Sequence, residues 1–221
     1  MRIATWNVER LKHYREITSI LREIETADAD ILVLTETDAR LFPRYPCAFH
    51  TPPLNEIRQG YYRDTENRVS VFSRHPCVRR HETCDPYTTI ALELDTPRGR
   101  LLVYGTIMGI FGNREASFKS DLTRQMADIR RLSEQGHRLC VAGDYNLSFG
   151  DNYYYTRHGR DLVNETFRDC GIDILTRDQP QCIDHIALTR GFADRPASID
   201  EWNKDKRLSD HKGIEADLGP E

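Results

Sequence analysis

The sequence has no excess of basic residues. It contains 31 lysines and arginines against 35 aspartates and glutamates, which gives a formal net charge of −4. A protein that wraps nucleic acid mainly through its overall electric field is usually basic, so the composition argues against a bulk polyanion binder. A local basic patch remains compatible with the composition, because the net charge says nothing of how charges are distributed.

Long hydrophobic runs and targeting signals are also lacking. No apolar run approaches the roughly 20 residues that span a bilayer, so no membrane span is expected. Met1 leads into strand-like residues and not into the charged and then apolar segments of a secretory signal. We therefore expect a cytoplasmic protein.

Cysteine pairs with zinc-site spacing are missing as well. The six cysteines are scattered along the chain, so reduced and mostly structural thiols are expected. A disulfide between Cys77 and Cys84 would require an oxidising compartment.

No repeat, low-complexity tract or linker divides the 221 residues, and this length suits one domain over residues 1–221. Alternating or continuous apolar residues predict strands at 2–6, 31–34, 68–73, 90–94, 101–106, 139–142, 183–188 and 213–218. Helical spacing predicts helices at 13–27, 114–135 and 159–170, whereas residues 43–53 and 191–208 are predicted to be loops. Strands outnumber helices, and hairpins mix with strand–helix–strand units. The pattern indicates one mixed α/β domain with helices outside one large sheet or two sheets.

Polar residues capable of chemistry recur at the ends of the predicted strands. They are Asn7, Glu36, residues 143–146, residues 184–185 and residues 209–211. Polar side chains held at strand ends usually converge on one site, so we expect these five segments to meet.

Glu36 follows an apolar strand and is a candidate ligand for a hard cation. Mg²⁺ needs only one or two protein carboxylates and takes its other ligands from water and phosphate. Glu9, two residues after Asn7, could supply a second oxygen. The alternative is that both acids are simply solvated at loop starts.

Two further pairs of residues suggest acid–base or phosphate chemistry. Asp144 and Asn146 flank Tyr145 and offer a carboxylate and an amide to one point, unless they only form a turn that caps itself. Asp184 and His211 could be neighbours, with the carboxylate fixing the imidazole so that its other nitrogen acts on water. His185 should point to the opposite face of its strand.

Two segments combine basic residues with other functional groups. The tyrosines of 153–155 precede Arg157, His158 and Arg160, a mixture that can stack bases and neutralise phosphate or simply pack on the domain. A second basic group comprises Arg74, Arg79, Arg80 and His81. We expect this second group to be solvated surface.

In chain order these motifs resemble those of the endonuclease/exonuclease/phosphatase superfamily, which includes exonuclease III, DNase I, inositol polyphosphate 5-phosphatases and neutral sphingomyelinases. Six segments carry the resemblance and span nearly the whole chain. They are Thr5-Trp6-Asn7-Val8, Leu34-Thr35-Glu36, Val71-Phe72-Ser73-Arg74, Gly143-Asp144-Tyr145-Asn146, Ile183-Asp184-His185-Ile186 and Ser209-Asp210-His211. Each is weak alone, but six in the same order are a strong signal. Thr35 stands where the superfamily usually has Gln.

The resemblance implies a four-layered α/β sandwich with two packed mixed sheets flanked by helices. It implies a divalent ion, usually Mg²⁺ with Mn²⁺ as an alternative, at Glu36, with Glu9 and Asp210 as further metal or orienting acids. Asn7, Asn146 and Arg157 are expected to hold phosphate. The expected catalytic residues are His211, Asp184, Asp144 and Asn146.

One departure from the superfamily concerns substrate class. Branches similar to DNase I and the phosphatases carry a histidine after the middle strand, where this chain has Gly105-Thr106-Ile107-Met108. A metal-dependent phosphodiesterase acting on nucleic acid is therefore the first hypothesis. The second is a hydrolase of a small phosphoester, such as a nucleotide or phospholipid headgroup, and the third is a non-enzymatic binding module on the same fold. The sequence gives no indication of the oligomeric state.

Overall fold

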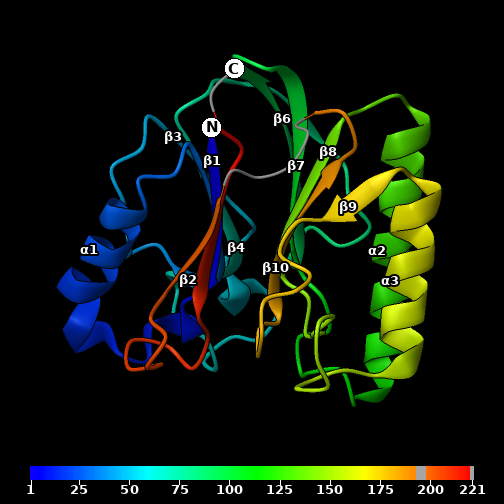
Figure 1. Cartoon of the computed structure of the whole chain (residues 1–221). Helices are drawn as coiled ribbons and strands as arrows, with labels where there is room; N and C mark the ends of the chain where they lie inside the picture. The colour runs from blue at the N-terminus through cyan, green and yellow to red at the C-terminus, as the bar shows by residue number, and fades with distance from the viewer. Residues whose placement is uncertain (193–197, 220–221) are drawn as a thin grey trace.

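Two six-stranded sheets lie face to face at the centre of the protein, and helices cover their outer faces (Figure 1). This computed structural model describes residues 1–192 and 198–219. The four layers confirm the predicted α/β sandwich.

The first sheet is built around the parallel pair of β1 and β2, with antiparallel strands on either side. Its strands, in spatial order, are β11 (Ser198–Trp202), β12 (Gly213–Asp217), β1 (Arg2–Asn7), β2 (Ile31–Asp38), β4 (Glu66–Ser73) and β3 (Cys47–His50).

The second sheet is built around the parallel pair of β7 and β8. Its strands, in spatial order, are β5 (Cys77–His81), β6 (Thr89–Thr96), β7 (Gly99–Ile107), β8 (Leu139–Asp144), β10 (Asp184–Thr189) and β9 (Ile172–Ile174). The predicted hairpin of β6 and β7 is present, with its turn between Thr96 and Gly99.

The helices pack through the apolar stripes that predict them. One stripe, with Ile20 and Ile24, places α1 (Ile17–Ala27) on the outer face of the first sheet. Another stripe, with Phe118 and Leu122, places α2 (Ala116–Glu134) on the second sheet beside α3 (Arg157–Asp169). Short 3-10 turns are η1 (Glu9–Leu11), η2 (Tyr14–Glu16) and η3 (Leu54–Glu56).

Alternating apolar residues from both sheets fill the space between them, as in Val69 and Val71 of β4 facing Ile90 of β6. Gly105 allows this close approach, since a Cβ there would lie 3.0 Å from a methyl group of Val69. The inter-sheet core therefore fixes how the two sheets face one another, and with them the strand ends that carry the polar motifs.

Four strands were not predicted, and the structure corrects the sequence analysis on each. The predicted loop at 43–53 contains β3, and the predicted loop at 191–208 contains β11, although residues 193–197 lie outside the described part of the chain. β5 and β9 were also missed. All four are the outermost strands of their sheets. Edge strands are paired on one side and half-exposed, so they lack the alternation that marks inner strands.

Two further observations concern the cysteines and the length of the helices. All six cysteines are free thiols, so Cys77 and Cys84 are not bonded to one another. Among the described residues, no helix combines the length and apolar character required to cross a bilayer.

Candidate active site

The buried amide of Asn7 connects three of the predicted polar segments. Asn7 ends β1, and its Nδ2 donates to Oε1 of Glu36 at 3.3 Å and to Oδ2 of Asp144 at 3.1 Å. Its Oδ1 accepts from the backbone N–H of Glu9 at 2.9 Å. β1 and β2 are parallel, so their carboxyl ends lie together, and β8 ends nearby in the second sheet. Three of the five segments predicted to converge therefore meet here.

Glu36 is presented by an irregularity in β2. Its φ is 46°, and the register of β2 with β4 passes from Thr35 to Thr37 without a partner for it. This left-handed conformation costs about 1–2 kcal/mol for an L-residue, so the surrounding strands must impose it. Within the described residues, the half-buried carboxylate forms no ion pair and has Asn7 as its hydrogen-bond partner.

Asp144 and Asn146 form a tight turn after β8. Gly143 precedes them with a φ of 139°, where a Cβ would lie 1.9 Å from the carbonyl oxygen of Thr106. The backbone N–H of Asn146 donates to Oδ1 of Asp144 at 2.8 Å. The Asn146 side-chain amide donates to the carbonyl of Met108 at 3.0 Å, which fixes both side chains at one point.

Asp184 and His211 form a short contact across the two sheets. Asp184 begins β10, lies opposite Asp144 in strand register, and places Oδ2 2.5 Å from Nδ1 of His211. Asp144, Asp184 and His211 each offer one ligand or proton-carrying atom within 4.8 Å of the others. His185 points the opposite way, into the core, where Nδ1 lies 3.0 Å from the hydroxyl of Thr176.

The turn that carries His211 is held by residues that the sequence analysis did not assign to the site. Ser209 donates from Oγ to the carbonyl of Asn7 at 2.6 Å and accepts from the N–H of His211 at 3.2 Å. The carbonyl of His211 accepts from Trp6 Nε1 at 3.1 Å and from Asn203 Nδ2 at 2.7 Å. These bonds tie the imidazole to the end of β1. The Ser-Asp-His motif offered a signal for Ser209, whereas nothing in the sequence marked Asn203.

Burial and mutual charge perturb the acid and the imidazole in opposite ways. Burial raises the pKa of Asp144, with the nearby Asp184 carboxylate adding to the effect and His211 opposing it. Burial alone would lower the pKa of His211, but the carboxylates of Asp184 and Asp144 outweigh it and raise the pKa above its ordinary value. The site thus favours a protonated imidazole beside an acid that titrates closer to neutrality than usual.

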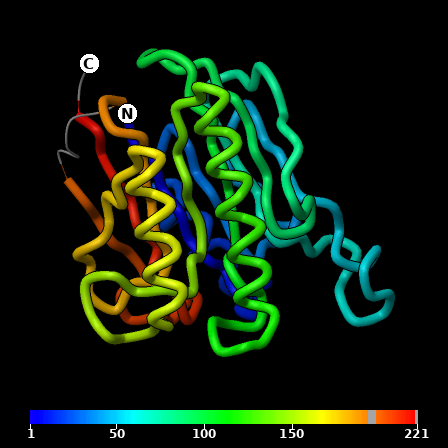
Figure 2. Tube along the Cα trace, turned by 90° about the vertical axis from the view of Figure 1, so that its right-hand side faces the viewer, coloured from blue at the N-terminus to red at the C-terminus, as the bar shows by residue number. Residues whose placement is uncertain are grey.

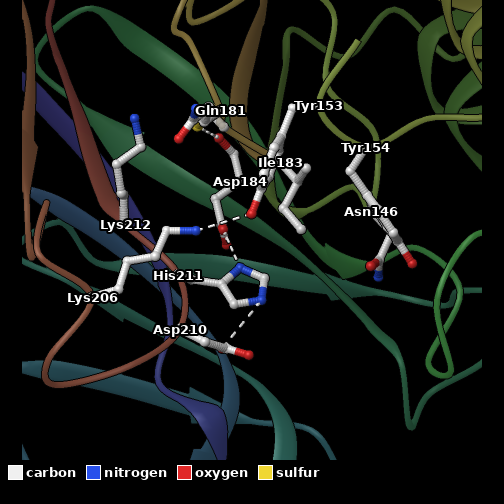
Figure 3. A pocket seen from close by; sticks show the side chains of 11 residues that line it. Asn146, Tyr153, Tyr154, Gln181, Ile183, Asp184, Lys206, Asp210, His211 and Lys212 are labelled. Atoms are coloured by element: carbon white, nitrogen blue, oxygen red, sulfur yellow. Dashed lines mark hydrogen bonds and ion pairs between the residues drawn. The ribbon is translucent and has the colours of Figure 1, made fainter.

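A cavity of about 240 Å³ opens directly onto His211 and Asp184 (Figure 3). Tyr153 and Lys206 face one another across it, with Lys206 Nζ 3.1 Å from the Tyr153 hydroxyl. Lys212 also borders the cavity and bonds to Glu201 at 2.7 Å. Lys206 forms no ion pair in the described structure and suits an anionic ligand, whereas Lys212 is ion-paired with Glu201. Neither lysine was predicted from the sequence.

The remaining predicted site residues differ in their placement. Asp210 borders the cavity, is exposed, and lies 3.7 Å from Nε2 of His211. Glu9 accepts from the Asp210 N–H at 3.3 Å, but its carboxylate is also paired with Lys12. Arg157 is the exposed first residue of α3 and is not among the residues that line the cavity.

The tyrosine-rich segment divides into two parts. Tyr153 and Tyr154 line the cavity. Arg160 instead stacks on Tyr155, with its guanidinium carbon 3.7 Å from the ring centroid, and binds the carbonyl of Ser148 at 2.5 Å. Arg160 therefore braces this loop from within.

The donor set at this edge fits a divalent cation. Glu36, Asp144 and Asp184 supply hard oxygen atoms, and Oδ1 of Asp184 is buried without a hydrogen-bond partner in the described structure. The Glu36 carboxylate forms no ion pair with any of the described residues. Of these three carboxylates, Asp184 alone is ion-paired in the described structure, to His211. Clustered carboxylates of this kind form an oxygen site that Mg²⁺ or Mn²⁺ can occupy.

The position that lacks the superfamily histidine is filled by core packing. Ile107 is buried between the sheets, and its carbonyl accepts from Nε2 of Gln125 at 3.1 Å. The carbonyls of the next two residues, Met108 and Gly109, hold the Asn146 amide. Backbone groups thus shape this part of the site.

Comparisons with known proteins show the fold and the family of the chain. No curated protein sequence matches the chain. Among solved structures, the 3′ phosphatase NExo from Neisseria bound to a product DNA hairpin has a TM-score of 0.71 at 18% identity, with 100% of each chain covered. The AP endonuclease LMAP from Leishmania major has a TM-score of 0.70 at 16% identity, covering 97% of this chain and 86% of that one.

The endonuclease domain of the telomere-specific non-LTR retrotransposon TRAS1 has a TM-score of 0.66 at 21% identity, covering 97% of this chain and 96% of that one. At these identities the structural similarity shows a shared fold. The Endonuclease/Exonuclease/phosphatase family matches residues 4–211, which include all six sequence motifs. The chain therefore belongs to the Endonuclease/Exonuclease/phosphatase family.

Proposed function

We propose that the protein is a metal-dependent phosphodiesterase that cleaves nucleic acid by attack of water on phosphorus. The observation that carries the proposal is the meeting of Glu36, Asn7, Asp144 and the Asp184–His211 pair at one edge of the two sheets, beside a lysine-lined cavity. We also propose that residues 1–221 form one domain. A cytoplasmic location is supported by the six free thiols.

In this proposal Glu36 is the principal metal ligand, and Asp210 and Glu9 are outer acids near the same ion. A divalent ion bound there would supply neutralisation of charge on the phosphoryl oxygens. Asn7 orients the Glu36 and Asp144 carboxylates through its Nδ2. Asn146 shapes the phosphate site.

Asp184 and His211 act on the reacting phosphoryl group in this proposal. The carboxylate of Asp184 holds Nδ1–H of His211, so Nε2–H faces the cavity and can donate to a phosphoryl oxygen. Charge developing on that oxygen in the transition state would strengthen the bond. Asp144, which is buried between Asn7 and His211, is placed to exchange a proton with the attacking water or the leaving oxygen.

An arginine–tyrosine surface beside the site supports nucleic acid as the substrate. Arg10 directly follows Glu9 and lies over Tyr62, with 4.8 Å between its guanidinium carbon and the ring centroid, while Arg58 lies 4.3 Å over Tyr61. Tyr61 is half-exposed, in the segment between η3 and β4 that projects from the body (cyan in Figure 2). Exposed aromatic rings next to guanidinium groups can stack bases and contact phosphates.

A small phosphoester is the second candidate, because the cavity beside His211 is only about 240 Å³ and is bridged by Tyr153 and Lys206. Such a cavity fits a single terminal group better than a continuous duplex. A terminal phosphate on a nucleic acid would satisfy both observations. Arg157, which lies outside the cavity, could contact only a longer substrate.

The proposal is tested by hydrolysis assays on DNA, RNA, nucleotides and phosphomonoesters with Mg²⁺ and with EDTA. We expect cleavage of nucleic acid that EDTA abolishes, and a loss of at least about 100-fold in Glu36→Gln. Glu25→Gln, on the exposed face of α1, is the matched control and should keep full activity. Hydrolysis of only the nucleotides would favour the second candidate. Folded wild-type protein that hydrolyses no substrate and binds no Mg²⁺ would indicate a non-enzymatic binding module.

A further inference from the structure

Two histidines and a glutamate form a second cluster of potential ligands, away from the active site. His81 ends β5, Glu93 lies in β6, and His137 follows α2. One ligand atom from each lies within 4.8 Å of the other two, and all three residues are half-buried. The three side chains come from separate elements, so the tertiary fold brings them together.

Strand register and a helix stop explain the convergence. His81 of β5 lies opposite Ala91 of β6, so these two side chains are on the same face of the sheet, the face that α2 covers. Glu93 lies two residues after Ala91 in β6 and is therefore on that face as well. Gly136, with a φ of 83°, reverses the chain after α2, and the N–H of His137 bonds back to the carbonyl of Leu132 at 3.3 Å. This turn returns the imidazole to the sheet.

The distances suit a tetrahedral ion. Nε2 of His81 lies 3.4 Å from Oε2 of Glu93, and the two imidazole rings have centroids 4.7 Å apart at 77°. With metal–ligand bonds near 2.1 Å, neighbouring ligands of a tetrahedral Zn²⁺ are separated by about 3.4 Å. One edge of the tetrahedron is therefore present already. The third ligand needs a shift of at most about 1.4 Å, within reach of a side-chain rotation.

Alternative partners for these groups are few. Among the described residues, the ring nitrogens of His137 have no hydrogen-bond partner, and the carboxylate of Glu93 bonds only to His81. Arg79 lies opposite Glu93 in the strand register, and Arg100 and Arg138 line the cavity beside it, so these arginines are the cations that compete for its carboxylate. A cavity of about 370 Å³ beside Glu93 and His137 leaves space for water as a fourth ligand.

The geometry points to a binding site for one divalent ion of the zinc class, held by His81, Glu93 and His137. Two imidazoles and one carboxylate favour Zn²⁺, Ni²⁺ or Cu²⁺ over Mg²⁺, which prefers oxygen ligands. This site and the active site lie at opposite ends of β7 and β8. Leu102 pairs with Leu139 at the end near His137, whereas Ile107 pairs with Asp144 at the end that carries the active site. Five residues of strand separate these positions by about 16 Å.

An ion at this position would connect the edge strand β5 to the turn between α2 and β8. Binding only to the folded state stabilises it by mass action. At about a hundredfold excess of free ion over Kd, the melting temperature of a protein of this size should rise by about 5–10 °C.

The test uses the full chain, stripped with chelator and titrated with Co²⁺ in excess Mg²⁺. A tetrahedral Co²⁺ site has intense visible absorption that the octahedral ion lacks. We expect this absorption at one ion per chain, and its loss in His137→Asn and in His81→Gln. His158→Asn, an exposed histidine of α3, should leave it unchanged. His211→Asn should also leave it unchanged, which separates this site from the active site.

Retention of the signal in His137→Asn, or its loss in His211→Asn, would overturn the proposal. No tetrahedral signal in the folded wild-type protein would overturn it as well. Circular dichroism of each variant shows whether a lost signal reflects unfolding. His137 lies in an exposed turn, so its variant should keep the fold.

Discussion

The contact between Asp184 and His211 leads to a quantitative prediction. Asp184→Asn keeps the shape of the side chain but removes the negative charge 2.5 Å from Nδ1 of the imidazole. Asp184 is buried and His211 is only partly exposed, so solvent replaces the lost carboxylate poorly. Without the Asp184 carboxylate, which is the main charge that raises the pKa of His211, burial of the imidazole would lower this pKa. The imidazole should lose both its fixed orientation and its positive charge.

The size of the effect follows from the strength of a charged hydrogen bond. Such bonds contribute about 1.5–3 kcal/mol, and each 1.36 kcal/mol of barrier changes a rate tenfold. We therefore expect kcat to fall by about 10- to 150-fold in Asp184→Asn. His211→Gln should fall by at least as much. If both residues act through one interaction, kcat of the double variant should be little lower than that of the less active single variant.

The assay is steady-state cleavage of a labelled oligonucleotide at saturating Mg²⁺, with urea unfolding of each variant as the control for folding. The expected coupling between the two substitutions is about 1.5–3 kcal/mol. Effects that simply multiply in the double variant would show that the two residues act independently. An Asp184→Asn enzyme within twofold of wild type would refute the role assigned to the pair.

Three further predictions concern stability and positioning. Burial raises the pKa of Glu215 in β12 from 4.5 to about 7, so the folded state holds more protons than the unfolded state between these values. The free energy of unfolding should therefore fall as pH rises from 4.5 to 7. In urea unfolding at pH 8, Glu215→Gln should be more stable than the wild type by about 1–3 kcal/mol, and its stability should depend less on pH. An unchanged pH profile in this variant would contradict the prediction. Gly143→Ala should lower the free energy of unfolding in urea by at least about 2 kcal/mol, because its Cβ would collide with the Thr106 carbonyl. Gly171→Ala, at a φ of 65° but with open space around it, should lower it by only about 1 kcal/mol. Equal losses in the two variants would argue against the collision. Ser209→Ala should lower kcat about tenfold and leave the Mg²⁺ affinity unchanged, because Oγ of Ser209 connects Asn7 to the turn that carries His211. An unchanged kcat would show that the other hydrogen bonds of this turn are enough to hold it.

The sequence predicted the inner strands and the helices because burial gives them periodic apolar residues. It missed β3, β5, β9 and β11, which are the edge strands of the two sheets. β5 reads Cys-Val-Arg-Arg-His and is mostly exposed, so its conformation depends on pairing with β6 and not on its own pattern. Tertiary pairing of this kind is not visible in a single segment.

The candidate site was predictable where a functional residue directly follows a run of apolar residues. Asn7 and Asp144 are the last residues of β1 and β8, and Glu36 follows the apolar part of β2. The parallel pairing of β1 with β2 brings Asn7 and Glu36 together, and the packing of the two sheets adds Asp144. The lysines at 206 and 212 could not be assigned, because they reach the cavity from a polar segment without a recognisable motif. The His81 cluster was equally hidden, since its members are 12 to 56 residues apart in the chain and meet only through the register of β5 and β6 and the turn after α2.

The proposed function requires one divalent ion to bind next to Glu36 and Asn7, in front of the Asp184–His211 pair. Anomalous diffraction from crystals soaked in Mn²⁺ and a phosphate ester measures this directly. We expect an Mn²⁺ peak within coordination distance of a Glu36 oxygen, with the phosphate between the ion and Nε2 of His211. An Mn²⁺ peak elsewhere, with phosphate absent from the space in front of His211, would contradict it.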